Sequence, residues 1–322
     1  METIAGFFDR IGTSLAGMVF SSVTLLGVDV QLIVLWLFAA MVFFTFRLGF
    51  LNLRGFAIGW RVLTGRYVDP DAPGELSPFQ ALSTALASTV GLGNIAGVAI
   101  AIAMGGPGAA FWMIIIGFFA MSLKYAEVTL AVRYRVINDD GTVSGGPMWY
   151  LSRGLAERGL PLLGKILATA YALFALFAFV QIVQVNQSYA QLSEVAGLQR
   201  GAGWALAYGV LIAAIAALVL IGGARSIGRV TARLTPFMCA LYVCGVLVVL
   251  GVNLHAVPGA VATMVYDAFS ADAAAGGIAG SFVAGMRRAA YSNEAGIGSA
   301  SIAHSAVKTR QPASQGFVAL IE

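Results

Sequence analysis

The sequence predicts an all-α polytopic membrane protein, in which a bundle of helices crosses a lipid bilayer. Composition is the first indication: 59% of the 322 residues are hydrophobic and 11% are charged, whereas soluble domains carry about 25% charged residues. The charges also leave apolar stretches between them that are long enough to cross a bilayer as helices. A soluble enzyme, a disordered chain and a secreted disulfide scaffold are therefore excluded. The net charge of +4 is spread over the loops, so we expect no nucleic-acid partner.

Charged residues mark the ends of the expected spans. The first 28 residues carry apolar side chains at helical spacing up to about residue 20, which predicts an amphipathic helix lying in the membrane interface. Between Glu75 and Lys124, 48 residues carry no charge, and a Gly-Gly-Pro turn at 105–107 divides them into two spans. The other charge pairs that bracket spans are Asp29 and Arg47, Lys165 and Glu194, Arg200 and Arg225, and Arg233 and Asp267. The chain, 1–322, is thus expected to be a single transmembrane domain, with 1–28 as its N-terminal segment, spans at about 29–47, 78–104, 107–133, 164–190, 202–222, 234–254 and 275–306, and the start of an eighth at about 314–322.

The distribution of basic residues predicts the orientation. Fourteen of the 19 lysines and arginines fall in the first, third and fifth loops and after the seventh span, whereas two fall on the opposite side. Cytoplasmic loops carry the excess of lysine and arginine in membrane proteins. We therefore expect the N-terminus outside and the basic loops in the cytoplasm.

The second span contains a glycine-rich stretch near its middle, Thr89-Val90-Gly91-Leu92-Gly93-Asn94. Glycine and asparagine weaken a helix, and backbone groups freed by a break find no partner in lipid, so a break there lines a cavity or binds a ligand. Backbone N–H groups at the start of a half-helix suit a carboxylate. Freed carbonyls, with the side-chain oxygens of Thr89 and Asn94, suit a hard cation such as Na⁺. Close helix packing through small residues is the alternative interpretation.

The seventh span repeats this pattern. Residues 90–94 and 295–299 both consist of a small apolar residue, Gly, an aliphatic residue, Gly and a polar residue, and their first glycines lie 205 residues apart. The seventh span is offset from the second by five spans, and an odd offset places the two helices in opposite directions. Paired interrupted helices in two inverted halves are the best sequence indication of a transporter's binding site.

Ionisable residues within spans are costly, which makes them candidates for function. Glu294 lies in the second glycine-rich stretch, and we expect it, with Asn293, to cap freed N–H groups or to join a gating network rather than to bind the cation. Lys124 and Glu127 are spaced i,i+3, which predicts an ion pair on the surface of the third span. No cluster of His, Cys or carboxylate residues has the spacing of a transition-metal site, so Na⁺ is the only metal expected.

Three stretches, residues 81–97, Gly145-Gly146-Pro147-Met148 and residues 292–300, resemble the alanine or glycine:cation symporter family, and the resemblance covers almost the whole chain. It implies a leucine-transporter-type fold, an inverted-repeat helix bundle that follows a peripheral first helix. It implies no enzymatic activity and no organic cofactor. The expected activity is Na⁺-coupled symport of small neutral amino acids, alanine and glycine, by alternating access across the bacterial or archaeal inner membrane, with H⁺ as the alternative coupling ion. Because such families have about eleven spans in inverted repeats, this chain would be an incomplete transporter, truncated within the second repeat.

The first break is also similar to the unwound first helix of the neurotransmitter:sodium symporters, and this similarity assigns roles to single residues. Residues expected to hold the substrate are Gly91, Leu92 and Gly93, through their backbone, together with Met286 and Ser292, which would face its side chain. Residues expected to hold the cation are Thr89 and Asn94, and the backbone around Ala87 and Val90 would serve a second cation site.

Two other classes stay open as alternatives. A channel would need a ring of carbonyls or charges along a pore. An intramembrane enzyme of unknown substrate would need a nucleophile and base, or metal ligands, within the spans. Saturable, Na⁺-dependent alanine uptake separates the symporter from both.

Overall fold

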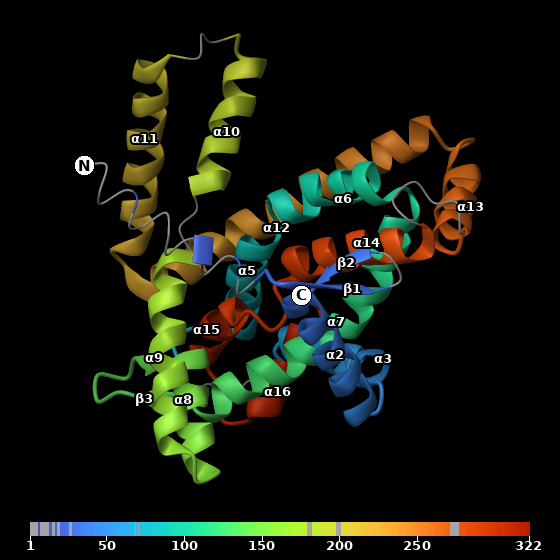
Figure 1. Ribbon diagram of the computed structural model, residues 1–322. Coiled ribbons are helices and arrows are strands. Elements are labelled where there is room, and N and C mark those ends of the chain that lie inside the picture. The colour runs from blue at the N-terminus through green and yellow to red at the C-terminus, as the bar shows by residue number, and fades with distance from the viewer. Residues whose placement is uncertain are drawn as a thin grey trace. The chain divides into compact units, whose positions relative to one another are not determined.

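The computed structural model describes residues 6, 13–14, 17, 20–25, 28–67, 69, 71–178, 182–197, 201–270 and 277–322. These residues are mainly helical with two short β hairpins (Figure 1), which confirms the predicted all-α class. They divide into two compact units. Unit 1 comprises Met1–Arg54, Gly93–Leu123 and Cys244–Ile297, and unit 2 comprises Gly55–Leu92, Lys124–Val243 and Gly298–Glu322. The interfacial helix predicted for the first 20 residues lies largely outside the described residues.

Unit 1 is built around three helices: α2 (Leu32–Arg47), the first part of α7 (Gly108–Arg133) and α14 (Gly277–Asn293). An antiparallel hairpin of β1 (Ser22–Leu25) and β2 (Val28–Gln31) leads into α2. The apolar faces of these helices meet in one core, whose buried members include Val34, Met41, Ile116, Val283 and Met286. The other helices of unit 1 are α3 (Leu51–Arg54), most of α6 (Leu92–Gly105), the end of α12 (Gly223–Val252) and α13 (Val257–Ala268).

Unit 2 contains two helical hairpins, one of α8 (Pro147–Glu157) and α9 (Pro161–Ala178), and one of α10 (Ile182–Val195) and α11 (Ala202–Leu220), as Figure 1 shows. The strands β3 (Val136–Ile137) and β4 (Val143–Ser144) pair antiparallel. The other helices of unit 2 are α4 (Phe56–Leu63), α5 (Pro78–Thr89), the start of α12, α15 (Ser299–Ser305) and α16 (Pro312–Ala319).

The start of α5 is fixed by a capping box. The backbone N–H of Gln80 donates to Ser77 Oγ at 3.2 Å, and the backbone N–H of Ser77 donates to Gln80 Oε1 at 2.9 Å. Both donors would otherwise lack a partner within the helix. Pro78 follows at the first helical position, where its fixed φ and missing N–H cost nothing.

Several helices are suited to a bilayer. Within the described part of the chain, α7, the segment Gly203–Leu220 of α11, and α12 are each long and apolar enough to cross a membrane, and α5 and α6 together pass the same test as one bent span. In the apolar stretches of α11 and α12, 0% and 6% of the residues are buried within the protein. So large an apolar surface fits lipid rather than water, which supports a multi-pass membrane protein.

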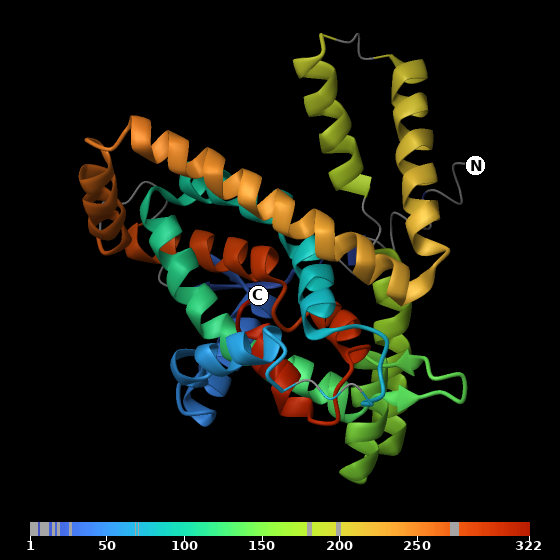
Figure 2. The same ribbon diagram turned by 180° about the vertical axis from the view of Figure 1, so that it is seen from behind.

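The structure differs from the expected spans in four places. α12 is one long helix (Figure 2), and the arginines expected in a loop before the sixth span, among them Arg225 and Arg233, lie within its first turns. Arginine is a good helix former, so charge alone did not mark a helix end. The first span begins at Leu32, after β2, and the fourth corresponds to α9 and α10, with residues 179–181 between them outside the described part. α13 had no counterpart in the sequence prediction.

Candidate functional site

The first broken helix is interrupted where the glycines predicted it. α5 ends at Thr89 and α6 begins at Leu92. Val90, between them, has φ −77° and ψ 85°, which is not helical. The hydroxyls of Ser88 and Thr89 donate back to the carbonyl of Ala85, at 2.8 and 3.1 Å. The break leaves the N–H groups of the first turn of α6 without acceptors inside that helix.

The second broken helix is interrupted between Asn293, the last residue of α14, and Ser299, the first of α15. Three residues of this segment have a positive φ: Glu294 at 52°, Gly296 at 84° and Gly298 at 98°. The side-chain oxygen of Asn293 accepts a hydrogen bond from the Ala295 N–H at 2.9 Å. This bond caps one backbone N–H of the break, while the capping or gating role expected of Glu294 stays a prediction.

In unit 1, the halves of the two broken helices lie against each other. The hydroxyl of Ser292, on α14, donates a short hydrogen bond to the side-chain oxygen of Asn94, on α6. A Cβ placed on Gly93 would lie 3.3 Å from Ser292 Cα, and one on Gly105 would lie 2.4 Å from Ala284 Cβ. The start of α6 thus contacts the end of α14, and the end of α6 contacts an earlier turn of α14. The two helices therefore run antiparallel. Three predicted site residues, Gly93, Asn94 and Ser292, are brought together here.

In unit 2, the other two halves, α5 and α15, also pack together. They enclose, with the start of α12, a cavity of about 340 Å³ lined by aliphatic side chains and by the hydroxyl-bearing Thr84, Ser88 and Ser299. Thr84 is held by the carbonyl of Gln80 at 2.8 Å and by the hydroxyl of Thr231 at 2.8 Å. The chain passes between the two units at each break, after Leu92 and after Ile297.

The other predicted site residues are placed as follows. Ala87, Thr89, Val90, Gly91 and Leu92 belong to unit 2, at the end of α5 and the first break. A Cβ placed on Gly91 would lie 3.5 Å from Oε1 of Gln184, on α10, which places an amide group beside the backbone of the first break. Met286 lies in unit 1, where its side chain is buried in the apolar core.

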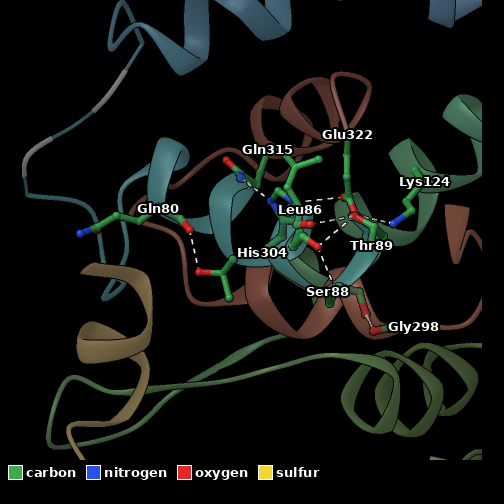
Figure 3. Close-up of polar contacts among 12 residues, drawn as sticks. Gln80, Leu86, Ser88, Thr89, Lys124, Gly298, His304, Gln315 and Glu322 are labelled. Atoms are coloured by element: carbon green, nitrogen blue, oxygen red, sulfur yellow. Dashed lines mark hydrogen bonds and ion pairs between the residues drawn. The ribbon is translucent and has the colours of Figure 1, made fainter. Parts of the chain in front are cut away.

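A buried cluster of charged and polar groups lies in unit 2 (Figure 3). Lys124 Nζ donates to Glu322 Oε1 at 2.6 Å, and both side chains are at most 5% exposed. His304 Nε2 lies 3.6 Å from the other oxygen of Glu322, and His304 Nδ1 lies 2.5 Å from the amide nitrogen of Gln315. We call Lys124, Glu322, His304 and Gln315 the buried charge cluster.

This cluster corrects the prediction for the third span. Lys124 and Glu127 were expected to form an ion pair on the helix surface, whereas both are buried and Lys124 is paired with Glu322. A buried ammonium needs a partner at hydrogen-bond distance, and Glu322 lies at that distance.

The sequence prediction missed Gln184, His304, Gln315 and Glu322. His304 and Gln315 are fully buried, and Gln184 stands beside a break from a helix that follows much later in the chain. No local pattern marks these contacts, because each joins different elements of the fold, as with Lys124 and Glu322, which are 198 residues apart. The only signal was the presence of a histidine and a glutamine in otherwise apolar segments.

Several helices are apolar and long enough to cross a membrane, and α5 and α6 form one such span that is bent at a glycine-rich break. A second helix pair, α14 and α15, is also interrupted at a glycine-rich segment, and α14 contacts α6. Together these features define a multi-pass membrane protein of the transporter class. The chain belongs to the sodium:alanine symporter family, whose model matches residues 15–322. This is a family of transporters and not of enzymes, as the three sequence motifs predicted.

Curated proteins that are similar to this chain have names that are consistent with this family. The sodium/alanine symporter AgcS of Methanococcus maripaludis is 40% identical over 283 residues, which are 87% of this chain and 61% of that protein. The probable sodium/glutamine symporter GlnT of Bacillus subtilis is 35% identical over 89% of this chain and 58% of its own length. The putative sodium/proton-dependent alanine carrier protein YrbD of Bacillus subtilis is 36% identical over 76% of this chain and 48% of its own length. The chain thus spans about half to three fifths of the length of these relatives.

Proposed function

We propose that this chain carries the first broken helices of a Na⁺-coupled symporter of small neutral amino acids, alanine and glycine. The observation that carries the proposal is the contact between α6 and α14. The backbone at Gly93 closes on Ser292, and the Ser292 hydroxyl meets the Asn94 amide oxygen. Backbone N–H groups and side-chain oxygens at one place are what a carboxylate and a hard cation require.

The substrate carboxylate is assigned to the backbone of Gly91, Leu92 and Gly93. These residues begin α6, where N–H groups lack acceptors within the helix and the dipole is positive. Within unit 1, Ser292 lies beside Gly93, and within unit 2, the amide of Gln184 lies beside Gly91. The close approach of α6 and α14 leaves little room for a side chain, which favours glycine and alanine.

The coupling ion is assigned to Asn94 and Thr89, with the carbonyls of Ala87 and Val90. Na⁺ is preferred because the donors are neutral oxygens, and H⁺ coupling is the alternative that the name of YrbD states for that protein. Lys124, Glu127, Asn293 and Glu294 are assigned to the network that holds the helices. Lys124 pairs with Glu322, and the side-chain oxygen of Asn293 accepts from a backbone N–H.

For the whole protein, we propose a leucine-transporter-type inverted-repeat bundle in the inner membrane with its N-terminus outside. The antiparallel contact of two interrupted helices that lie five expected spans apart supports the inverted repeat. The excess of lysine and arginine in alternate loops supports the orientation.

Uptake of labelled alanine and glycine into proteoliposomes that contain the full-length transporter tests this function. We expect saturable uptake that needs an inward Na⁺ gradient and that a K⁺ gradient does not support. A proton gradient that replaces Na⁺ would instead indicate H⁺ coupling. Glutamine that competes better than alanine would indicate the substrate that the name of GlnT states for that protein. Equal uptake with and without any ion gradient would contradict symport.

A further inference from the structure

Arg135 follows the end of α7 by two residues and reaches four backbone carbonyls. Its Nη1 donates to the carbonyls of Ser305 and Val307 at 2.7 and 2.6 Å. Its Nη2 donates to those of Pro73 and Thr309 at 2.9 and 2.6 Å. One guanidinium therefore joins the segment that enters α5 to the segment that leaves α15.

The two segments are also paired through their backbones. Leu76 and Val307 form a parallel β-bridge, in which the Leu76 N–H donates to the Ala306 carbonyl at 3.0 Å and the Lys308 N–H donates to the Leu76 carbonyl at 2.8 Å. A Cβ on Gly74 would lie 2.3 Å from the carbonyl oxygen of Val307, so the approach there requires glycine. Leu76 is separated from α5 by Ser77 alone, which leaves almost no slack between the bridge and the helix.

An arginine suits this place better than any other side chain. Its planar guanidinium presents five N–H donors in a fixed fork, whereas lysine offers three from a single point. A positive charge is also stabilised near the C-terminal end of α15, where backbone carbonyls carry partial negative charge. Burial lowers the pKa of Arg135 from its ordinary value, yet a guanidinium stays protonated in proteins, so these bonds persist at physiological pH.

We propose that Arg135 is a positioning residue that locks α5 and α15 into one body, so that these halves of the two broken helices move together during transport. This inference rests on the proposed function, because it concerns motion in a transport cycle. The opposite arrangement, in which α5 and α15 part to open a path between them, would need the four carbonyls and the bridge to separate in every cycle.

A disulfide across the bridge separates the two arrangements. The variant Leu76→Cys/Val307→Cys, in the full-length transporter, places two cysteines at paired positions of the parallel bridge, a spacing that a disulfide accepts. If α5 and α15 move together, the oxidised protein keeps alanine uptake close to that of the same protein after reduction. Uptake that stops on oxidation and returns on reduction would overturn the proposal.

A second measurement does not depend on transport. Val307 is fully buried, so a single Val307→Cys should react slowly with a thiol reagent. We expect Arg135→Ala to raise that rate by about tenfold or more, because the segment opens locally, and Arg135→Lys to give an intermediate rate. The matched control is Arg153→Ala, which removes an exposed arginine that stacks on Trp149. Equal rates with and without Arg135 would overturn its role even if Na⁺-driven uptake were present.

Failure of the proposed symport and failure of the proposed role of Arg135 give different results. If the unmodified transporter takes up no alanine, the proposed function fails, while the thiol reaction rates still report on the lock. If Arg135→Ala does not yield folded protein by gel filtration, Arg135→Lys carries the same comparison. In the transport assay, Arg135→Lys should lower the maximal uptake rate and leave the half-saturating alanine concentration unchanged, since Arg135 does not touch the break.

Discussion

The side-chain oxygen of Asn94 accepts a hydrogen bond from Ser292, and we propose that it also binds the coupling ion. An amide oxygen has two lone pairs, so it can accept from the Ser292 hydroxyl and contact a cation at the same time. Ser292 thus sets the direction in which the amide points. In the second break, the side-chain oxygen of Asn293 likewise accepts a hydrogen bond, from the Ala295 N–H. Short polar side chains stabilise each break through a small number of hydrogen bonds. A single substitution can therefore change the geometry of a break.

Replacing Asn94 tests the cation assignment. Asn94→Leu keeps the size of the side chain and removes its oxygen, so Na⁺ activation of alanine uptake should be lost. Asn94→Asp keeps an oxygen donor and should retain part of the Na⁺ dependence. The measurement is uptake against Na⁺ concentration in the full-length transporter. Unchanged activation in Asn94→Leu would remove this residue from the cation site.

Replacing Gly93 tests the substrate assignment. A new Cβ would lie 3.3 Å from Ser292 Cα, tighter than ordinary contact, and overpacking of this kind costs roughly 1–3 kcal/mol. Gly93→Ala should therefore weaken alanine binding by about tenfold or more, and glycine binding by less. Gly117→Ala on α7 is the control, because no atom lies within 4 Å of its added Cβ. Equal loss of alanine and glycine binding would contradict a pocket shaped by size.

The ion pair between Lys124 and Glu322 ties α7 to the chain beyond α16. Both groups are buried, and removal of Lys124 leaves the Glu322 carboxylate with His304 as its remaining partner at 3.6 Å. Breaking a buried pair in this way costs about 3–5 kcal/mol. Lys124→Met should lower the thermal unfolding temperature of the full-length protein in detergent. Lys124→Met/Glu322→Met should recover most of the loss. Lys165→Met, at an exposed lysine of α9, is the control. A double variant as unstable as the single one would contradict a direct pair.

Sequence reasoning located both helix breaks because the effect of glycine on a helix is local. It failed where contacts are not local. Lys124 lies three residues from Glu127 and 198 from Glu322, and only the folded chain shows that the distant carboxylate is a partner and that the site is buried. The arginines at the start of α12 were assigned to a loop, since the pattern of charge does not distinguish a loop from a helix end that projects beyond the apolar span.

The orientation of the molecule can be tested at exposed positions of two connections. Arg153, on α8, is exposed and lies in a loop expected in the cytoplasm. Arg153→Cys in an otherwise cysteine-free protein should react with an impermeant thiol reagent only after the cell membrane is opened. His255→Cys, between α12 and α13, should react in intact cells. The reverse pattern would place the N-terminus inside.

Substrate choice is a property of the assembled transporter. A pocket formed where α6 and α14 touch should admit glycine and alanine and exclude leucine, because each extra methylene forced into a packed site costs roughly 1–3 kcal/mol. Charged amino acids should be excluded more strongly for want of a counter-charge. Competition against labelled alanine measures this. Leucine that displaces alanine with equal potency would show that the pocket is not small.

The glycines of the two breaks differ in how well each position tolerates a side chain. Gly296 and Gly298 have φ values of 84° and 98°, and a Cβ on Gly298 would lie 2.4 Å from Pro147 Cγ. Any other residue is penalised there whatever the cargo. Gly91 and Gly93 do not have a positive φ, and a Cβ on Gly91 would meet only the flexible amide of Gln184 at 3.5 Å. A substitution at Gly91 is therefore expected to be tolerated more easily than one at Gly296 or Gly298, while Gly93 is constrained by the close approach of Ser292 Cα.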